Sequence, residues 1–171
     1  ALPREQAHLD AIRSCVAGDM HRGGRQIDAL LASEPRDAVA LAVGHQIDFF
    51  TGDAANLRDR VARARPHWDA RHPDFGFVDG MLAFGCEECG DYARSAEIGL
   101  RAVERNADDV WAIHAVVHTF EMQGRVDEGI AFLEQRRAAW AQGNFFNVHN
   151  AWHLAIYRLE REEWTAALET C

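Results

Sequence analysis

The sequence predicts an all-α protein made of about five consecutive helix–turn–helix repeats. Three observations support this fold class. A glycine-containing turn recurs at regular spacing, apolar residues between the turns recur with helical periodicity, and no segment shows the alternation typical of strands. Alanine, arginine, glutamate and leucine, which favour helices over strands, dominate the composition. The 171 residues suffice for one domain of this kind.

The turn motif consists of a glycine, a polar residue and the first residue of the following helix. Its third residue falls at Met20, Ala54, Tyr92, Val126 and Trp164, so the spacing alternates between 34 and 38 residues. Glycine suits this position because it readily adopts the left-handed conformation that ends a helix. In the fifth copy the glycine is replaced by Glu162.

Each repeat is expected to contain one helix before its turn and one after it. In chain order the repeats cover residues 4–37, 38–72, 75–108, 109–142 and 147–171, the last incomplete, in a single array over residues 1–171. Pro35 ends the second helix of the first repeat, and a polar turn at residues 106–109 does the same in the third. The fourth repeat begins with a helix whose apolar face consists of Ile113, Val116, Val117 and Phe120.

Two connections between repeats are longer than the others, and each contains a tryptophan. Trp68 and Trp140 lie 72 residues apart, which is the length of one short and one long repeat together. We interpret both as packing residues that fill the wider gap between pairs of repeats. A ligand-binding role is the alternative.

Composition excludes several classes of function. The net charge is −9 and no basic patch is present, so we expect no nucleic acid partner. All cations are arginine, and the absence of lysine excludes Schiff-base chemistry and a P-loop. No apolar run is long enough to span a membrane, and no signal peptide is recognisable, so no membrane association is expected.

The cysteines indicate a reducing compartment. Cys15, Cys86, Cys89 and Cys171 are too few and too unevenly placed for a disulfide framework, which favours a cytoplasmic location. Cys86 and Cys89 have CxxC spacing, but neither a second pair nor a thioredoxin-like context accompanies them. We interpret them as small packing thiols, with redox or metal chemistry as the alternative.

Four of the nine histidines are concentrated in two short segments. His114, His118 and Glu121 lie at i, i+4 and i+7, on a helix face different from the apolar one. His149 and His153 repeat the i, i+4 spacing on the first helix of the next repeat. First helices of successive repeats are neighbours, so the two pairs are expected to approach each other. A turn one residue shorter would instead bury Trp152 and Leu159, together with Ala155 and Ile156, and rotate the second pair slightly.

The repeat itself does not require these histidines. The residues 72 positions before His114 and His118 are Ala42 and Gln46. A local cluster on a repeat scaffold is a candidate functional site. Three interpretations remain open: His114, His118, His149 and His153 bind zinc or iron, they bind a small polar ligand or transfer protons to it, or they serve packing and partner binding. The H-E-x-x-H motif of zinc proteases is absent.

The sequence resembles a known repeat in general and one family of repeat proteins in particular. The turn spacing resembles the tetratricopeptide repeat over essentially the whole chain. The tetratricopeptide repeat protein 38 family is resembled by residues 34–37 with His45, 80–85, 87–88, 111–118, 121–122 and 149–157. This resemblance implies a right-handed α-solenoid whose first helices line the concave side, with His114, His118 and Glu121 in the groove. Glu87 stands at the position equivalent to Glu121. The family has no settled activity, and its members are longer than this chain.

The sequence therefore favours a scaffold that binds a protein, a peptide or a small ligand in its concave groove. The candidate groove residues are Glu87, His114, His118, Glu121, His149 and His153, and their acidic members favour a basic or polar partner. No cofactor is certain; a divalent metal, zinc or iron, is possible. The alternative function is a metal- or His/Glu-dependent enzyme acting on a small molecule. The fifth repeat breaks off without a polar cap, from which we expect a longer protein or a homodimer through the C-terminal end.

Overall fold

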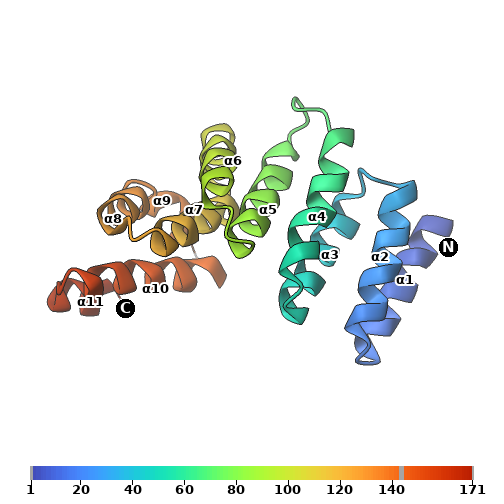
Figure 1. Cartoon of the computed structure of the whole chain (residues 1–171), viewed down its shortest axis with the longest axis horizontal. Coiled ribbons are helices and arrows are strands. Elements are labelled where there is room, and N and C mark those ends of the chain that lie inside the picture. Colours follow the sequence, from blue (N-terminus) through green and yellow to red (C-terminus); the bar gives the residue numbers. More distant parts are fainter. Residues whose placement is uncertain (1, 143–144, 171) are drawn as a thin grey trace. The chain divides into compact units, whose positions relative to one another are not determined.

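A computed structural model describes residues 2–142 and 145–170, and all regular structure within these ranges is helical. The helices are α1 (Pro3–Val16), α2 (Met20–Ser33), α3 (Ala38–Thr51), α4 (Ala54–Ala64), the 3₁₀ helix η1 (Arg65–His67), α5 (Phe75–Glu88), α6 (Tyr92–Arg105), α7 (Val110–Met122), α8 (Val126–Gln135), α9 (Arg137–Trp140), α10 (Phe145–Glu160) and α11 (Trp164–Thr170). They form two compact units, Ala1–Val78 and Asp79–Cys171 (Figure 1). No described helix is both long and apolar enough to cross a membrane.

The first unit contains two antiparallel helix pairs, α1–α2 and α3–α4, with α2 packed against α3 (Figure 1). Three helices begin at aspartates whose side chains accept a backbone N–H: Asp19 at α2, Asp37 at α3 and Asp53 at α4. This contact satisfies a donor that the first helical turn would otherwise leave unpaired. The apolar core between the helices is fully buried and includes Ala11, Ile27, Leu41, Leu57 and Val61.

The second unit continues the same pattern. Helix α6 packs against α7, α7 against α8, and α10 against both α7 and α8. Its core includes Val117, Phe120, Leu133, Leu154 and Tyr157. The contact between α8 and α10 is close: a Cβ added to Gly129 would lie 2.3 Å from the Tyr157 ring. The Tyr157 hydroxyl donates to the Val117 carbonyl at 2.6 Å, which fixes α10 on α7.

The five turns share one backbone geometry. Gly18, Gly52, Gly90 and Gly124 have φ between 65° and 87°, and Glu162 has φ 59° at the fifth turn. After each of them the next N–H bonds to a carbonyl five residues back, as in the bond from Glu163 to Arg158 at 2.9 Å. This is the Schellman arrangement that ends a helix at a left-handed residue. The fifth turn therefore keeps the geometry although its glycine is lost.

Replacing Glu162 with glycine is expected to stabilise the chain by up to about 1 kcal/mol. The left-handed conformation costs a residue with a Cβ about 1–2 kcal/mol, and the entropy of an added glycine offsets part of the gain. Gly124→Ala is the matched opposite, because its Cβ would meet no atom within 4 Å and only the backbone conformation is penalised. Urea denaturation of the three proteins measures both effects. A Glu162→Gly variant less stable than the parent would contradict this account of the turn.

The long connections each contain one turn of helix and one buried tryptophan. Trp68 follows η1 and donates its indole N–H to the Pro35 carbonyl at 3.1 Å. Trp140 ends α9, is 1% exposed and donates to the Leu133 carbonyl at 2.8 Å. Both side chains are buried with their polar atom bonded to protein, which supports the packing interpretation.

The shorter-turn alternative for the fifth repeat is wrong. It required Trp152 and Leu159 to be buried, but they are 53% and 43% exposed. The buried side of α10 instead carries His153, Leu154 and Tyr157. One residue corresponds to about 100° of rotation about the helix axis, so a change of register by one residue changes the buried face.

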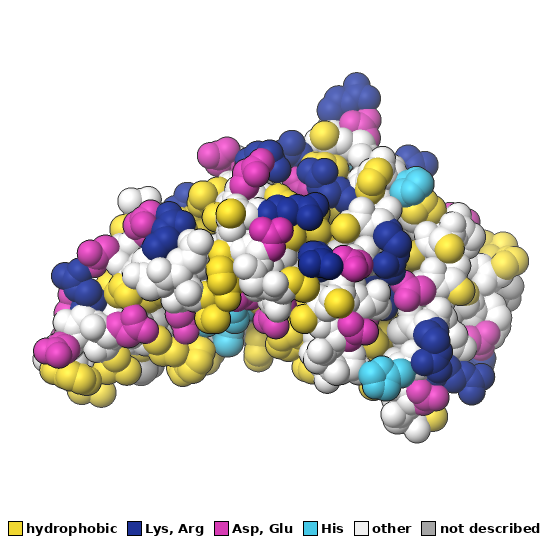
Figure 2. Space-filling model, in the orientation of Figure 1, with side chains coloured by type: hydrophobic (Ala, Val, Ile, Leu, Met, Phe, Trp, Pro, Cys, Tyr) yellow, Lys and Arg dark blue, Asp and Glu magenta, His cyan; other side chains and the backbone are white. Residues whose placement is uncertain are grey.

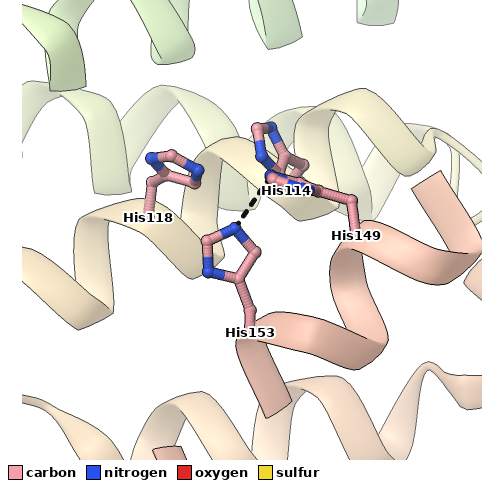
Figure 3. Close-up of side chains that lie close together, drawn as sticks. All are labelled: His114, His118, His149 and His153. Atoms are coloured by element: carbon pink, nitrogen blue, oxygen red, sulfur yellow. Dashed lines mark hydrogen bonds between the residues drawn. The ribbon is translucent and has the colours of Figure 1, made fainter. Parts of the chain in front are cut away.

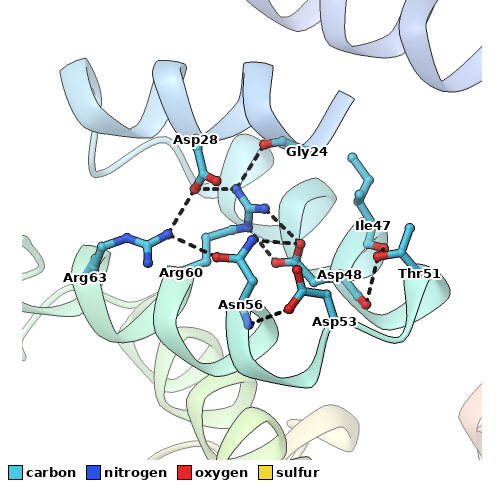
Figure 4. A network of polar contacts seen from close by, with 9 residues as sticks. All are labelled: Gly24, Asp28, Ile47, Asp48, Thr51, Asp53, Asn56, Arg60 and Arg63. Carbon is cyan, nitrogen blue, oxygen red and sulfur yellow. Dashed lines mark hydrogen bonds and ion pairs between the residues drawn. The ribbon is translucent and has the colours of Figure 1, made fainter. Parts of the chain in front are cut away.

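A buried arginine holds three helices of the first unit together, and the sequence analysis missed it. Arg60 on α4 is 1% exposed and forms a bidentate pair with Asp48 of α3, at 2.7 and 2.8 Å. Its third nitrogen donates to Asp28 of α2 at 2.7 Å and to the Gly24 carbonyl at 3.3 Å (Figure 4). Gly44 provides the space, because a Cβ there would lie 2.7 Å from the Arg60 side chain.

Candidate functional site

The four predicted histidines lie together between α7 and α10. His114 and His118 come from α7, and His149 and His153 come from α10 (Figure 3). Each pair stands one helical turn apart, so both rings of a pair leave the same side of their helix. Each residue offers a ring nitrogen within 4.8 Å of those of the other three.

His153 is held by a carboxylate on one side and by a second histidine on the other. Its Nδ1 lies 2.7 Å from Glu121 Oε2, and its Nε2 lies 3.1 Å from His149 Nε2. The ring is 2% exposed. The hydrogen bond from His153 lowers the pKa of Glu121, so this carboxyl is ionised at neutral pH.

His118 has a similar partner on α5. Its Nδ1 lies 3.5 Å from Oε2 of Glu87, which is 5% exposed. Its Nε2 is buried and has no hydrogen-bond partner. Glu87 therefore faces Nδ1 of His118 as Glu121 faces Nδ1 of His153, but the distance from oxygen to nitrogen is longer.

His114 lies at the centre of the cluster without a hydrogen bond. Both of its ring nitrogens are buried and lack a hydrogen-bond partner, and the residue is 4% exposed. Its ring centroid is 4.3 Å from that of His118 and 4.7 Å from that of His149. Burial, followed by the neighbouring histidines, lowers the pKa of His114 well below its usual value, so the ring is neutral.

His149 forms the more open side of the cluster. Its ring stacks on Phe145 with centroids 6.2 Å apart and on Trp152 with centroids 5.7 Å apart. Burial, and then the charge of neighbouring His153 and His118, lowers the pKa of His149. This ring therefore joins the histidine cluster to an aromatic surface on α10.

A second group of potential ligands lies beside the first. Glu87, Glu88 and His118 offer ligand atoms within 4.8 Å of one another, and Glu88 is exposed. Partial desolvation of its carboxyl group, and then the negative charge of Glu87, raise the pKa of Glu88. The site residues predicted from the sequence thus all lie in this region, with Glu87 on α5 and Glu121 on α7.

The cysteines stand apart from these groups. Cys86 is buried on α5, Cys15 and Cys89 are half-buried, and none of the three belongs to either ligand group. Their interpretation as packing thiols stays a prediction. Cys171 lies outside the described residues.

Helix α10 also carries an exposed apolar surface that was not predicted from the sequence. Its members are Phe145, Val148, Trp152 and Leu159, with exposed fractions between 43% and 78%. Trp164 and Leu168 on α11 are also exposed, and apolar side chains follow these two helices in Figure 2. Positions 145, 148, 152 and 159 share one side of the helix, but other sides of it are apolar as well.

Solved structures with the same fold contain tetratricopeptide repeats. MamA from Desulfovibrio magneticus RS-1 is 11% identical, with a TM-score of 0.71 over 99% of this chain and 92% of that one. A Podosopora anserina protein with TPR-like repeats, described as a kinesin light chain, is 14% identical, with a TM-score of 0.73 over 97% and 90%. YrrB, described as a TPR protein with an unusual peptide-binding site, is 15% identical, with a TM-score of 0.61 over 96% and 80%.

The predicted fold class, an all-α solenoid of tetratricopeptide repeats, is confirmed by these similarities. No family model matches the chain. The finer resemblance to the tetratricopeptide repeat protein 38 family therefore stays a prediction, as do the single array over residues 1–171 and dimerisation through the C-terminal end.

Proposed function

We propose that this protein is a repeat scaffold that binds a polypeptide segment along α7 and α10. The observation that carries the proposal is the exposed apolar surface of α10, called the apolar stripe below. It lies directly beside the face of α7 that carries His114, His118 and Glu121. A partner segment with both apolar and basic side chains fits this combination. The cytoplasmic location predicted above belongs to this proposal.

The stripe lies at the groove positions of its repeat. Trp152 and Leu159 follow His114 and Glu121 by 38 residues, which is also the offset between the turn residues Val126 and Trp164. Equivalent positions of neighbouring repeats face the same side of an array, so the apolar and polar side chains form one surface. The concave faces of such arrays are where they bind extended segments.

The chemistry of this surface favours a particular partner. Trp152 stacks on His149 and leaves 53% of its own surface exposed, so it offers a rigid apolar platform. Glu121 on α7 is ionised, and Glu88 on α5 is exposed. An apolar side chain of the partner would occupy the platform, while an arginine or lysine would pair with the carboxylates. The peptide-binding site in the description of YrrB supports this use of the fold.

A peptide-display selection followed by fluorescence anisotropy tests the proposal. Selected peptides should carry aromatic or aliphatic residues near basic ones. Trp152→Ala should weaken their binding at least about fivefold, because an exposed aromatic platform typically contributes more than about 1 kcal/mol.

Leu168→Ser is the control, since this residue is more exposed than Trp152, 78% against 53%, but lies on α11. Peptides whose binding depends on Leu168 and not on Trp152 would place the interface elsewhere. Failure to select any peptide would count against a polypeptide partner.

A further inference from the structure

We propose that His114, His118, His149 and His153 together bind one divalent transition-metal ion, with zinc as the best match. This inference goes beyond polypeptide binding and does not depend on it. It assigns the histidine cluster a ligand of defined charge, size and preferred geometry.

The geometry of the cluster suits a four-coordinate ion. Zinc bonds imidazole nitrogen at about 2.0–2.1 Å, so ligand atoms of a tetrahedral site stand about 3.4 Å apart. The Nε2 atoms of His149 and His153 are already 3.1 Å apart, and all four residues offer a nitrogen within 4.8 Å of the others. Side-chain rotations that bring the more distant rings inward would complete the site.

Unsatisfied ring nitrogens support the same site. Three ring nitrogens, both of His114 and Nε2 of His118, are buried without a hydrogen-bond partner. Buried polar atoms are rarely left in this condition, because each loses its hydration on folding and gains nothing in return. Coordination of an ion would satisfy one nitrogen on each ring.

Two carboxylates complete the arrangement from outside. Glu121 contacts Nδ1 of His153 at 2.7 Å, and Glu87 lies 3.5 Å from Nδ1 of His118. A carboxylate on one ring nitrogen fixes the tautomer and leaves the other nitrogen as a metal ligand. Carboxylates this close to a cluster of ring nitrogens favour a cation in this buried place.

The hydrogen bond between His149 and His153 must be broken before both Nε2 atoms can bind a metal ion. Because Glu121 accepts the Nδ1 proton of His153, the hydrogen bond between the two histidines is donated by Nε2–H of His149. That proton is lost to water when His149 binds the ion through Nε2, and uptake of a proton at Nδ1 keeps the ring neutral. An all-nitrogen set of this kind matches zinc, copper, nickel and iron, and a tetrahedral arrangement favours zinc among them.

Metal content of the untagged chain, measured by inductively coupled plasma mass spectrometry, is the first test. The chain should then be stripped with a chelator and titrated with Zn²⁺ by calorimetry and with Co²⁺ by visible absorption. We expect one ion per chain and the intense d–d bands of tetrahedral Co²⁺ with nitrogen ligands. Cobalt–thiolate charge-transfer bands would instead place the ion on cysteines and overturn the proposal.

Three variants make the test specific. His149→Ala, at the most open position, should weaken Zn²⁺ binding at least a hundredfold while circular dichroism stays unchanged. Glu121→Gln should keep the stoichiometry and weaken binding about 10–100-fold, as expected for a positioning residue. His72→Ala, a half-exposed histidine of the first unit, should bind Zn²⁺ like the parent.

Two results would overturn the proposal. One is a stripped parent chain that binds no stoichiometric Zn²⁺ or Co²⁺. The other is a His149→Ala variant that is folded and binds both ions as tightly as the parent. Peptide binding is measured separately on stripped protein, so failure of either proposal leaves the other testable.

Discussion

Arg60→Met is expected to lower the free energy of unfolding of the first unit by about 3–5 kcal/mol. Methionine occupies the space of the arginine stem, so the main loss is electrostatic. Asp48 remains buried, its side chain only 4% exposed, without the guanidinium that pairs with both of its oxygens. An uncompensated buried carboxylate is far more costly than the net value of the pair. Urea denaturation, with amide exchange of α3 and α4 to locate the effect, measures the loss.

Two controls separate this explanation from a loss of packing. Arg63 contacts the same Asp28 but has a side chain 58% exposed, so Arg63→Met should cost no more than about 1 kcal/mol. Adding Asp48→Leu to Arg60→Met removes the orphaned charge and should recover much of the stability. If the double variant is no more stable than Arg60→Met, the charge explanation is wrong.

The second large effect is acid destabilisation through His45. This side chain of α3 is 1% exposed, and burial lowers its pKa to about 3, with Leu57 opposing and Arg60 adding to the shift. In the unfolded chain the pKa is near its usual 6.5, so between about pH 6.5 and 3 only the unfolded state binds this proton. Each pH unit in that window therefore removes about 1.4 kcal/mol of stability, up to about 4–5 kcal/mol in total.

Comparison with His45→Gln isolates this contribution. Other groups also destabilise the fold in acid, so the informative quantity is the difference between the two proteins. Below pH 6.5 the free energy of unfolding of the parent should fall more steeply with decreasing pH than that of His45→Gln. The difference in slope should correspond to the uptake of up to one proton on unfolding. Above pH 7 the two plots of unfolding free energy against pH should run parallel. Equal slopes between pH 6 and 4 would show that His45 is protonated in the folded state.

Much of the fold could be predicted because the turns carry a strong local signal. Gly18, Gly52, Gly90 and Gly124 all adopt the left-handed conformation that the repeat requires, and Glu162 does so in the fifth turn. Helical periodicity between the turns then indicated one helix before and one helix after each turn. The four histidines could be brought together from sequence because i, i+4 spacing and the adjacency of first helices are both local rules.

Long-range polar contacts could not be predicted in this way. Arg60 lies on a helix with many polar residues, and arginine is usually exposed, so nothing nearby marks it as buried. The available hint was indirect: Gly24 and Gly44 lie inside helices, where glycine is unfavourable and therefore indicates close packing. The side chain that fills the space beside Gly24 is that of Arg60, which lies 36 positions later in the sequence.

The exposed stripe on α10 was missed for a different reason. Apolar residues cover more than one side of this helix, so periodicity alone does not show which side is buried. The structure resolves the question through Tyr157, whose ring lies against Gly129 and whose hydroxyl bonds to Val117. That contact turns Trp152 toward solvent.

The contacts of Glu87 with His118 and of Glu121 with His153 join the first helices of three successive repeats, α5, α7 and α10. In a repeat array the cooperativity of unfolding depends on the energy of each interface between neighbours. Polar groups buried across both interfaces strengthen this nearest-neighbour coupling. We therefore expect α5 to α10 to lose structure as one cooperative block rather than repeat by repeat.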